Sequence, residues 1–284
     1  MDYVRMFEEL PFDRNNPLFS HRHMRLVELF YSWHKALISY VFEEKSWYTY
    51  TGKKWEKDYE GLFVMGLCNN FVDGMITFAN NYDGEREMSS LSSFPAKYDA
   101  EQMRTRLVQG TKNLARKSIA SFDQNVNLIN CQNGTLNLET FILQPHNPED
   151  YIMQICGVTY DINANTEQWE HFIDEIMLND KETARYLQKA LGYCLTGKTW
   201  LEKFFIFYGM RTRNGKGTLS ETIRNVLGDY GRTAQAPTFA HRPRDGAAAS
   251  PDIARLKGAR YVNSPEPDKT ITLNAALDEA IDRW

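Results

Sequence analysis

The sequence has few cysteines and no pair of them spaced like metal ligands. The four are Cys68, Cys131, Cys156 and Cys194, and the six histidines show no ligand-like spacing near them. This pattern predicts no zinc site. A disulfide framework is typical of small secreted chains, so for 284 residues we expect a reducing compartment.

Signals for secretion or membrane insertion are also missing from the pattern. Met1–Asn16 carries four acidic residues and two arginines and lacks the apolar core of a signal peptide. The longest apolar runs, such as Phe204–Tyr208, are far shorter than the roughly 20 residues that cross a bilayer. We therefore expect a cytoplasmic protein with no membrane partner.

Strong net charge is absent as well. The formal charge of −4 argues against a protein that coats nucleic acid non-specifically, although a local basic groove remains compatible with it. The hydrophobic content of 42% and charged content of 25% are typical of globular proteins. The length allows two domains of roughly 100–200 residues each.

Hydrophobic periodicity predicts a mixed α+β organisation. Helices are expected at about residues 25–38, 58–80, 101–118 and 180–194, and one more begins after Asn165 or Thr166. In this last helix one buried face is expected; in the helix at 58–80 another face is expected to pack. These faces comprise Trp169, Phe172, Ile173 and Ile176, and Leu62, Phe63, Gly66, Leu67 and Phe71, respectively.

Two hairpins are expected in the first two thirds of the chain. Trp47–Tyr50 pairs with the residues around Trp55 through Thr51–Lys53. Val126–Ile129 pairs with Thr135–Leu138 through Asn133-Gly134, which tolerates positive φ in a tight turn. Val158–Tyr160 is a further candidate strand, and Ser89–Ser93 is expected to be a loop.

The expected helix at residues 101–118 is rich in basic side chains. They are Arg104, Arg106, Lys112, Arg116 and Lys117. Two interpretations stay open: a hydrated helix face, or a face that positions a phosphate backbone.

The most informative stretch begins at Phe204–Tyr208. Five apolar residues in a row predict a strand buried on both faces, as in a parallel sheet covered by helices. Gly209–Thr218 follows, and then a helical pattern that Gly228 is placed to stop. Strand, glycine-bounded loop and helix together are typical of a phosphate-binding loop, whose backbone N–H groups and helix N-terminus face phosphate oxygens.

The roles of the loop residues follow from their chemistry. Gly215 lets the backbone approach phosphate closely, Lys216 reaches the β- and γ-phosphates, and the Thr218 hydroxyl is offered to Mg²⁺. The loop departs from the standard pattern, because five residues rather than four precede Gly-Lys and Gly217 stands where Ser or Thr is usual. A strand–helix turn without chemical meaning is the alternative.

An acidic residue at the end of a neighbouring strand would complete such a site. Arg260–Asn263 predicts a short strand, and Glu266 lies just beyond it. Glu266 is therefore a candidate to hold Mg²⁺ through water or to polarise an attacking water. A solvated loop glutamate is the alternative.

Five ordered motifs carry a resemblance to a known family. They are residues 133–138, 145–151, 191–197, 213–218 and 250–260, the last running into Glu266. The stretch from about Trp47 to Asn274 resembles the phage and plasmid primase–helicase family. This group includes the poxvirus primase-helicase, whose ATPase is a superfamily 3 helicase, and it tolerates Gly-Lys-Gly-Thr in the loop.

The resemblance implies a fold and a set of site residues. Residues 1–195 would be a mostly helical α+β N-terminal domain with β-hairpins, and residues 196–284 the first part of an α/β P-loop ATPase of the AAA+ type. ATP and Mg²⁺ are the implied cofactors. Lys216 and Glu266 would be catalytic, Thr218 and Glu266 would serve the metal, and the remaining nucleotide contacts would come from Gly209, Asn214, Gly215 and Gly217.

The resemblance also implies partners. Members assemble as rings, typically hexamers, around single-stranded or forked DNA and act with other replication proteins. The family's basic segment, sensor residue and arginine finger are expected after Glu266 but do not follow in this sequence, and no primase module precedes the matched region. We therefore expect ATP binding and leave hydrolysis open.

Two other classes of function remain open. One is a non-catalytic DNA-binding or interaction fragment, in which the aromatic hairpin at Trp47 and Trp55 stacks on bases. The other is a small-molecule kinase, which usually carries its phosphate loop near the N-terminus and closes a lid over its substrate; neither feature is evident here.

Overall fold

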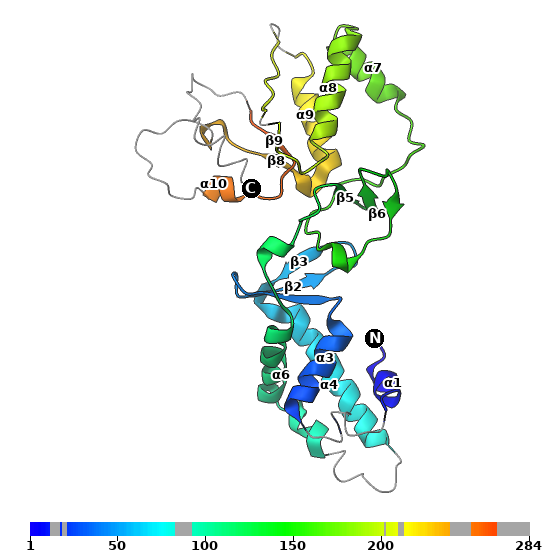
Figure 1. Ribbon diagram of the computed structural model, residues 1–284, viewed down its shortest axis with the longest axis vertical. Coiled ribbons are helices and arrows are strands. Elements are labelled where there is room, and N and C mark those ends of the chain that lie inside the picture. The colour runs from blue at the N-terminus through cyan, green and yellow to red at the C-terminus, as the bar shows by residue number, and fades with distance from the viewer. Residues whose placement is uncertain are drawn as a thin grey trace. The chain divides into compact units, whose positions relative to one another are not determined.

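The computed structural model describes residues 1–11, 18, 22–82, 93–201, 203–209, 213–238 and 251–265. The chain divides into two compact units, residues 1–122 and residues 123–284 (Figure 1). Each unit is described by itself. The domain boundary expected after residue 195 came from the family resemblance and differs from the boundary between these two units. It stays a prediction.

The first unit combines helices with one mixed sheet. The helices are α1 (Tyr3–Glu8), α3 (His23–His34), α4 (Leu62–Asn81) and α6 (Glu101–Leu114), with 3-10 turns at Tyr59–Gly61, Lys97–Asp99 and Ile119–Ser121. The strands are β1 (Ile38–Val41), β2 (Ser46–Tyr50), β3 (Trp55–Asp58) and β4 (Arg116–Lys117), in the order β3-β2-β1-β4. Helices α3, α4 and α6 lie side by side in Figure 1.

The predicted aromatic hairpin is confirmed. Strands β2 and β3 are antiparallel, with Tyr50 opposite Trp55, and Gly52 adopts a φ of 94° in the turn between them. The carboxylate of Asp58, at the end of β3, accepts hydrogen bonds from the backbone N–H groups of Phe63 and Val64 at 3.0 and 3.1 Å. These bonds satisfy donors that a helix leaves unpaired at its start, so they fix where α4 begins.

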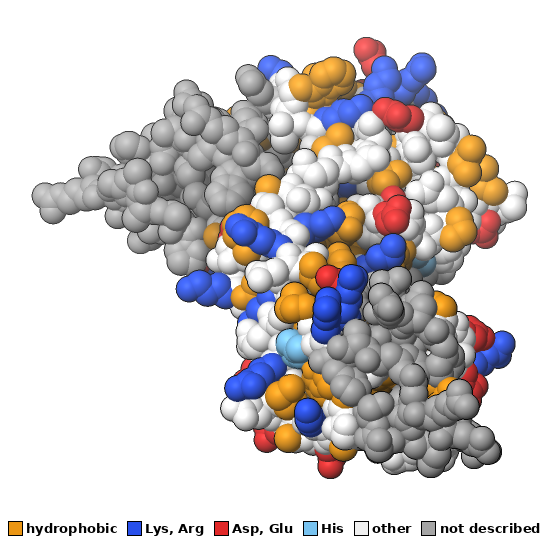
Figure 2. Space-filling view, turned by 60° about the horizontal axis from the view of Figure 1, so that its bottom comes forward, with side chains coloured by type: hydrophobic (Ala, Val, Ile, Leu, Met, Phe, Trp, Pro, Cys, Tyr) orange, Lys and Arg blue, Asp and Glu red, His pale blue; other side chains and the backbone are white. Residues whose placement is uncertain are grey.

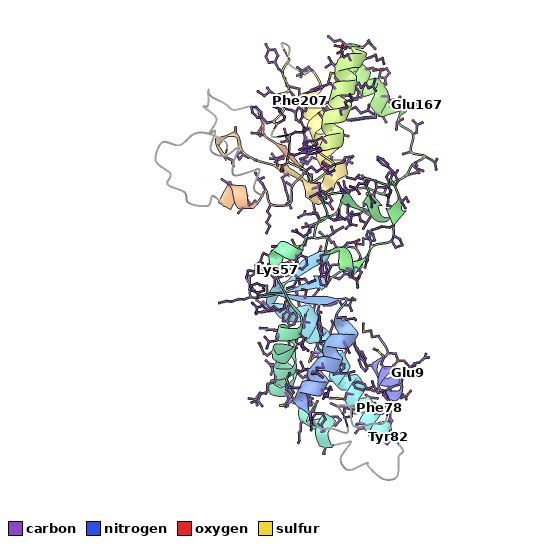
Figure 3. The ribbon with its side chains drawn as sticks, viewed as in Figure 1. Glu9, Lys57, Phe78, Tyr82, Glu167 and Phe207 are labelled. Atoms are coloured by element: carbon purple, nitrogen blue, oxygen red, sulfur yellow. The ribbon has the colours of Figure 1, made fainter. Side chains whose placement is uncertain are left out.

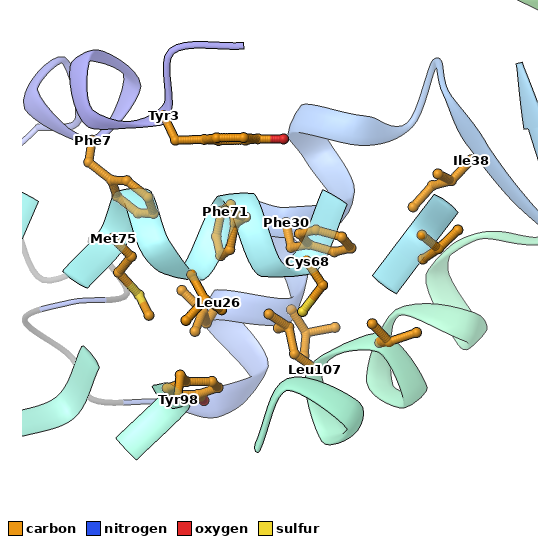
Figure 4. Close-up of a cluster of buried hydrophobic side chains, with 14 of the residues drawn as sticks. Tyr3, Phe7, Leu26, Phe30, Ile38, Cys68, Phe71, Met75, Tyr98 and Leu107 are labelled. Carbon is orange, nitrogen blue, oxygen red and sulfur yellow. The ribbon is translucent and has the colours of Figure 1, made fainter. Parts of the chain in front are cut away.

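The core of the first unit lies along α4. Figure 4 shows Tyr3 and Phe7 of α1 against one side of α4, with Tyr98 and Leu107 on the other side. Phe71 lies in the middle, with ring centroids 5.2 Å from Phe7 and 6.0 Å from Tyr3. Near the end of the helix, Phe78 packs on Tyr82 at 5.7 Å (Figure 3).

The helix expected at residues 58–80 is confirmed, but of its predicted face only Phe71 is buried. Leu62 and Phe63 are 68% and 45% exposed, whereas the buried residues are Val64, Cys68, Phe71, Val72, Gly74, Met75, Phe78 and Ala79. Apolar residues occur around much of this helix, so periodicity alone left its orientation open. The contacts with α1 and α6 decide which face is buried.

Helix α4 is relevant to the expectation that no segment of the chain crosses a membrane. Among the described residues, Tyr59–Asn81 is long and apolar enough to cross a membrane by length and composition, with a mean hydropathy of 1.4 over its best window. It is longer than the apolar runs on which the expectation rested. The core helix of a globular domain can have the same length and composition, and α4 supplies much of the core of its unit.

The second unit joins two small sheets to three longer helices. Strands β5 (Leu128–Cys131), β6 (Gly134–Asn137) and β7 (Leu143–Gln144) form one antiparallel sheet, and β8 (Gly231–Thr233) pairs with β9 (Tyr261–Asn263) in parallel. The helices are α7 (Glu167–Ile176), α8 (Lys181–Tyr193), α9 (Lys216–Leu227) and the short α10 (Pro251–Ala254). The 3-10 turns lie at Pro148–Asp150, Gly228–Tyr230 and Ala236–Thr238.

The predicted hairpin at residues 126–138 is confirmed, but its turn lies one residue earlier. Cys131 pairs with Gly134, so the turn residues are Gln132 and Asn133. Gly134 serves another purpose: a Cβ there would stand 2.5 Å from the Gln144 carbonyl oxygen of β7. The glycine therefore permits close approach of the third strand, which Asn-Gly spacing cannot reveal.

Three smaller expectations need correction. Residues 158–160 form no strand; the Asn133 side chain exchanges two hydrogen bonds of 2.9 Å with the Tyr160 backbone instead. The basic helix ends at Leu114, because Arg116 and Lys117 extend to pair with β1. Of the expected Ser89–Ser93 loop, Ser89–Ser92 lie outside the described residues.

Candidate phosphate-binding loop

Helix α9 begins at Lys216, inside the candidate loop, and includes the helix that the sequence predicts after Thr218. Gly215 caps it with a φ of 79°, a left-handed conformation that glycine adopts without a steric penalty, and its carbonyl accepts the first helical hydrogen bond from Leu219 at 2.9 Å. The helix ends at Leu227, and Gly228 follows with a φ of 56°. The predicted helix and its stop are therefore confirmed.

The side chains of the loop converge on Gly209. A Cβ at this glycine would overlap the Asn214 side-chain amide and stand 3.8 Å from the Lys216 Nζ. The two ends of the loop therefore lie close together, with the lysine directed back across it. Gly217 and Thr218 are exposed on the first turn of α9.

Helix α7 packs against the same loop. A Cβ at Gly215 would stand 2.5 Å from Ile176 Cγ2 and 3.4 Å from Phe172 Cε2, and Phe172 in turn contacts Trp169 at a centroid distance of 5.7 Å. The predicted apolar face of α7 thus meets the loop. It is half-buried rather than buried, because α7 contains no buried residue.

Phe204–Tyr208 was predicted to be a strand buried on both faces. The segment forms no strand in the structure, and its predicted burial is wrong as well. Ile206 and Tyr208 are 75% and 83% exposed, and no strand among the described residues pairs with the segment. Its contact is with α8, where the rings of Tyr186 and Phe205 lie 6.4 Å apart; Figure 3 labels Phe207 on this segment. A central strand needs hydrogen-bonded neighbours and covering helices, and an apolar run cannot supply those by itself.

The predicted strand at Arg260–Asn263 is confirmed as β9. The Tyr261 hydroxyl donates a hydrogen bond of 3.1 Å to Ser220 Oγ, which joins β9 to the second turn of α9. Tyr261 and Leu227 also share an apolar cluster with Tyr230 and Ile129. The structure thus places the strand that leads to Glu266 beside the loop helix, whereas Glu266 itself lies outside the described residues.

Arg260 is a supporting residue that sequence reasoning missed. Its guanidinium donates hydrogen bonds of 2.6 Å to the carbonyl oxygens of Leu195 and Leu128, and it lies 4.5 Å from the centre of the Tyr230 ring. Burial lowers the pKa of Arg260 and raises that of nearby Asp123. These partners come from three distant parts of the sequence, so no local signal could have identified the role.

The aromatic hairpin of the first unit is unsuited to base stacking. Trp47 and Trp55 are 5% and 2% exposed, and Tyr48 and Tyr50 are also buried. Stacking on a base requires an accessible ring face. The interpretation of these rings as a nucleic-acid platform is therefore wrong; they form core.

The basic helix is largely occupied by internal contacts. Arg104 donates to the Tyr98 carbonyl and pairs with Asp73 at 2.8 Å. Lys112 and Arg116 lie over the Tyr40 and Phe42 rings at 4.8 and 4.2 Å, respectively. Figure 2 shows Lys, Arg, Asp and Glu side chains among hydrophobic and other side chains on one face of the molecule. The helix therefore fits a structural role better than a phosphate-contact face.

Within the described ranges, no group of three or more His, Cys, Asp or Glu side chains is placed to hold a metal ion. Thr218 and Glu266, the two residues expected to serve Mg²⁺, would hold it mainly through water and bound nucleotide, as Mg²⁺ sites in nucleotide-binding proteins often do.

The described elements define an α+β N-terminal domain followed by a glycine-capped loop and helix. A family model described as D5 N terminal like matches residues 27–178, which is more than half of the chain. The chain therefore belongs to this family, and the expected primase–helicase-type N-terminal domain is confirmed. The match ends before the candidate loop.

One relative extends the comparison. A protein of Acanthamoeba polyphaga mimivirus named "Putative helicase" is 28% identical over 163 residues. The match covers 56% of this chain but only 17% of the length of that protein.

Proposed function

We propose that this chain is a replication protein of the primase–helicase type that binds ATP with Mg²⁺ at Gly209–Thr218. Membership of the D5-like family and the helicase name of the mimivirus relative support the general class. The convergence of Asn214 and Lys216 on Gly209, at the N-terminus of α9, is the observation that supports nucleotide binding.

The proposal assigns each loop residue a part in binding a triphosphate. A Cβ at Gly209 would fill the space that the Asn214 amide occupies, so the loop is built for close approach of its two ends. The α9 N-terminus attracts anions, because its first N–H groups are free of helical partners. Lys216 would neutralise the β- and γ-phosphates, Thr218 would contact Mg²⁺, and Glu266 would act on the water around the metal.

The partners follow from the same proposal. A ring of identical subunits, typically a hexamer in this class, would surround single-stranded or forked DNA in the cytoplasm, alongside other replication proteins. Binding to single-stranded DNA that weakens steeply with added salt would support it.

The direct test is calorimetric titration of the full chain with ATP and Mg²⁺. Replacing Lys216 with alanine removes charge-assisted hydrogen bonds worth about 1.5–3 kcal/mol, so affinity should fall roughly 10- to 150-fold. Lys189→Ala, at an exposed position of α8, is the matched control and should bind like the unchanged protein. Equal affinity of the Lys216 variant would show that the loop has been assigned wrongly.

A further inference from the structure

Two of the four cysteines, far apart in the sequence, meet in the core of the second unit. Cys131 ends β5 and is 6% exposed; Cys156 is 2% exposed, and both belong to one apolar cluster. The Cys156 backbone N–H donates to the Asn130 carbonyl at 2.7 Å, and the Gln132 side chain donates to the Cys156 carbonyl at 2.8 Å. These two bonds hold Cys156 against Cys131 from both sides.

The two thiols also influence each other's protonation. The neighbouring Cys156 side chain lowers the pKa of Cys131, whereas Cys131 and burial together raise that of Cys156. Cys131 is therefore the thiol of the pair that more readily becomes a thiolate. Both cysteines are free in the structure.

We propose that Cys131 and Cys156 form a reversible disulfide, making this pair a thiol-modification site in the second unit. The co-reactant would be a low-molecular-weight disulfide. The Cys131 thiolate attacks one sulfur of that disulfide and releases one thiol, leaving a mixed disulfide. Cys156 then loses its proton and attacks the Cys131 sulfur, which forms the Cys131–Cys156 bond and releases the second thiol. The protein is oxidised by two electrons, and the small disulfide is reduced to two thiols.

The bond would link β5 to the segment around Cys156, which is hydrogen-bonded to the end of the loop helix. The Gly157 N–H donates to the Val226 carbonyl near the C-terminus of α9 at 3.0 Å, and the Asp229 N–H donates to the Ile155 carbonyl at 2.9 Å. Cys156 therefore lies between the small sheet and α9. Oxidation would add a covalent link where hydrogen bonds now hold these elements, and this consequence is independent of whether α9 binds nucleotide.

The other two cysteines act as internal controls. Burial raises the pKa of Cys68 to about 12 and also raises that of Cys194. A thiol whose pKa is raised reacts slowly with an external disulfide, because the thiolate is the nucleophile. This holds for buried Cys68 and for half-buried Cys194. They should remain reduced while the pair reacts.

The test treats the native full chain with oxidised glutathione, alkylates the remaining thiols and maps the peptides by mass spectrometry. We expect a loss of 2 Da, two alkylated cysteines instead of four, and one cross-linked peptide joining Cys131 to Cys156. Four alkylated cysteines after treatment, or glutathione carried equally by Cys68 and Cys194, would overturn the proposal.

Variants separate the pair from a general thiol effect. Cys131→Ser should abolish the 2 Da loss, whereas Cys194→Ser should retain it. Closing a loop of about 26 residues constrains the unfolded chain, so the oxidised protein should unfold several degrees higher, and dithiothreitol should reverse the shift. An unchanged Tm in the cross-linked protein would contradict the link between β5 and the segment around Cys156. The wild-type peptide map needs no variant to fold, so it decides the proposal in any case.

Discussion

Gly74 is the position where one added methyl group should do most damage to the first unit. It lies in α4 against α1, and a Cβ there would overlap the Cβ of Tyr3 and stand 3.5 Å from the Tyr3 Cα and carbonyl carbon. A Cβ is fixed to the backbone, so no rotamer change can move it away. In Gly74→Ala, α1 must therefore shift as a whole or leave its site.

The cost can be estimated from what α1 buries. Tyr3 and Phe7 are 7% and 0% exposed, and burying a large apolar side chain contributes about 1.5–3 kcal/mol. The Tyr3 hydroxyl also hydrogen-bonds His34 Nε2 at 2.7 Å, which adds about 1 kcal/mol. Alanine gains about 1 kcal/mol of helix propensity over glycine, and a shifted α1 retains part of its packing. We expect a net destabilisation of about 2–4 kcal/mol.

Gly66 provides a matched control in the same helix, because a Cβ there would meet no atom within 4 Å. Gly66→Ala should therefore stabilise by up to about 1 kcal/mol. Urea denaturation followed by circular dichroism measures both variants, and hydrogen exchange of residues 3–8 locates the effect in α1. The reasoning is refuted if Gly74→Ala is as stable as Gly66→Ala and leaves exchange at residues 3–8 unchanged.

Three further predictions concern other parts of the chain. Gly215→Ala places an alanine in a left-handed conformation and brings its Cβ to 2.5 Å from Ile176, so it should lower the free energy of unfolding by about 2 kcal/mol. Gly217→Ala, with open space around it, should change that free energy by no more than about 0.5 kcal/mol, and calorimetry measures both variants. Arg260→Ala removes two hydrogen bonds to carbonyl groups and a positive charge near the buried Asp123 carboxylate, so it should cost about 3–5 kcal/mol of stability. Exposed Arg255→Ala should be nearly neutral, and equal Tm values for the two variants would contradict this role. Burial lowers the pKa of His34 below the unfolded value of about 6.5, so the unfolded state binds more protons and stability should fall as pH drops below about 6.5; His34→Gln should flatten that slope in urea titrations at successive pH values.

The local elements followed closely from the sequence. The β2–β3 hairpin was predictable from alternating aromatic residues around Gly52, because turn geometry needs only a few neighbouring residues. Helix α9 and its end at Gly228 were predictable for the same reason, since caps and helical periodicity are local properties. The family motifs likewise pointed to the N-terminal domain that the family match covers.

The long-range arrangements could not be predicted in this way. The sequence did not correctly predict which face of α4 is buried. The apolar residues of α4 permit more than one buried face, and the contacts with α1 choose among them. The run Phe204–Tyr208 was read as a buried strand, but strand formation depends on neighbours that lie elsewhere in the chain. The aromatic rings of β2 were offered as a binding surface, and their burial is decided by what packs over them.

For the candidate site, the sequence alone determined which residues are proposed to carry the chemistry. The glycines, Lys216 and Thr218 were predicted because a phosphate-binding loop uses those residue types at similar spacing. Only the tertiary structure decided that Lys216 is directed back toward Gly209, that Arg260 joins three segments, and that Cys131 meets Cys156. Each of these depends on distances between residues far apart in the sequence, and such distances are set by packing of the whole unit rather than by local preference.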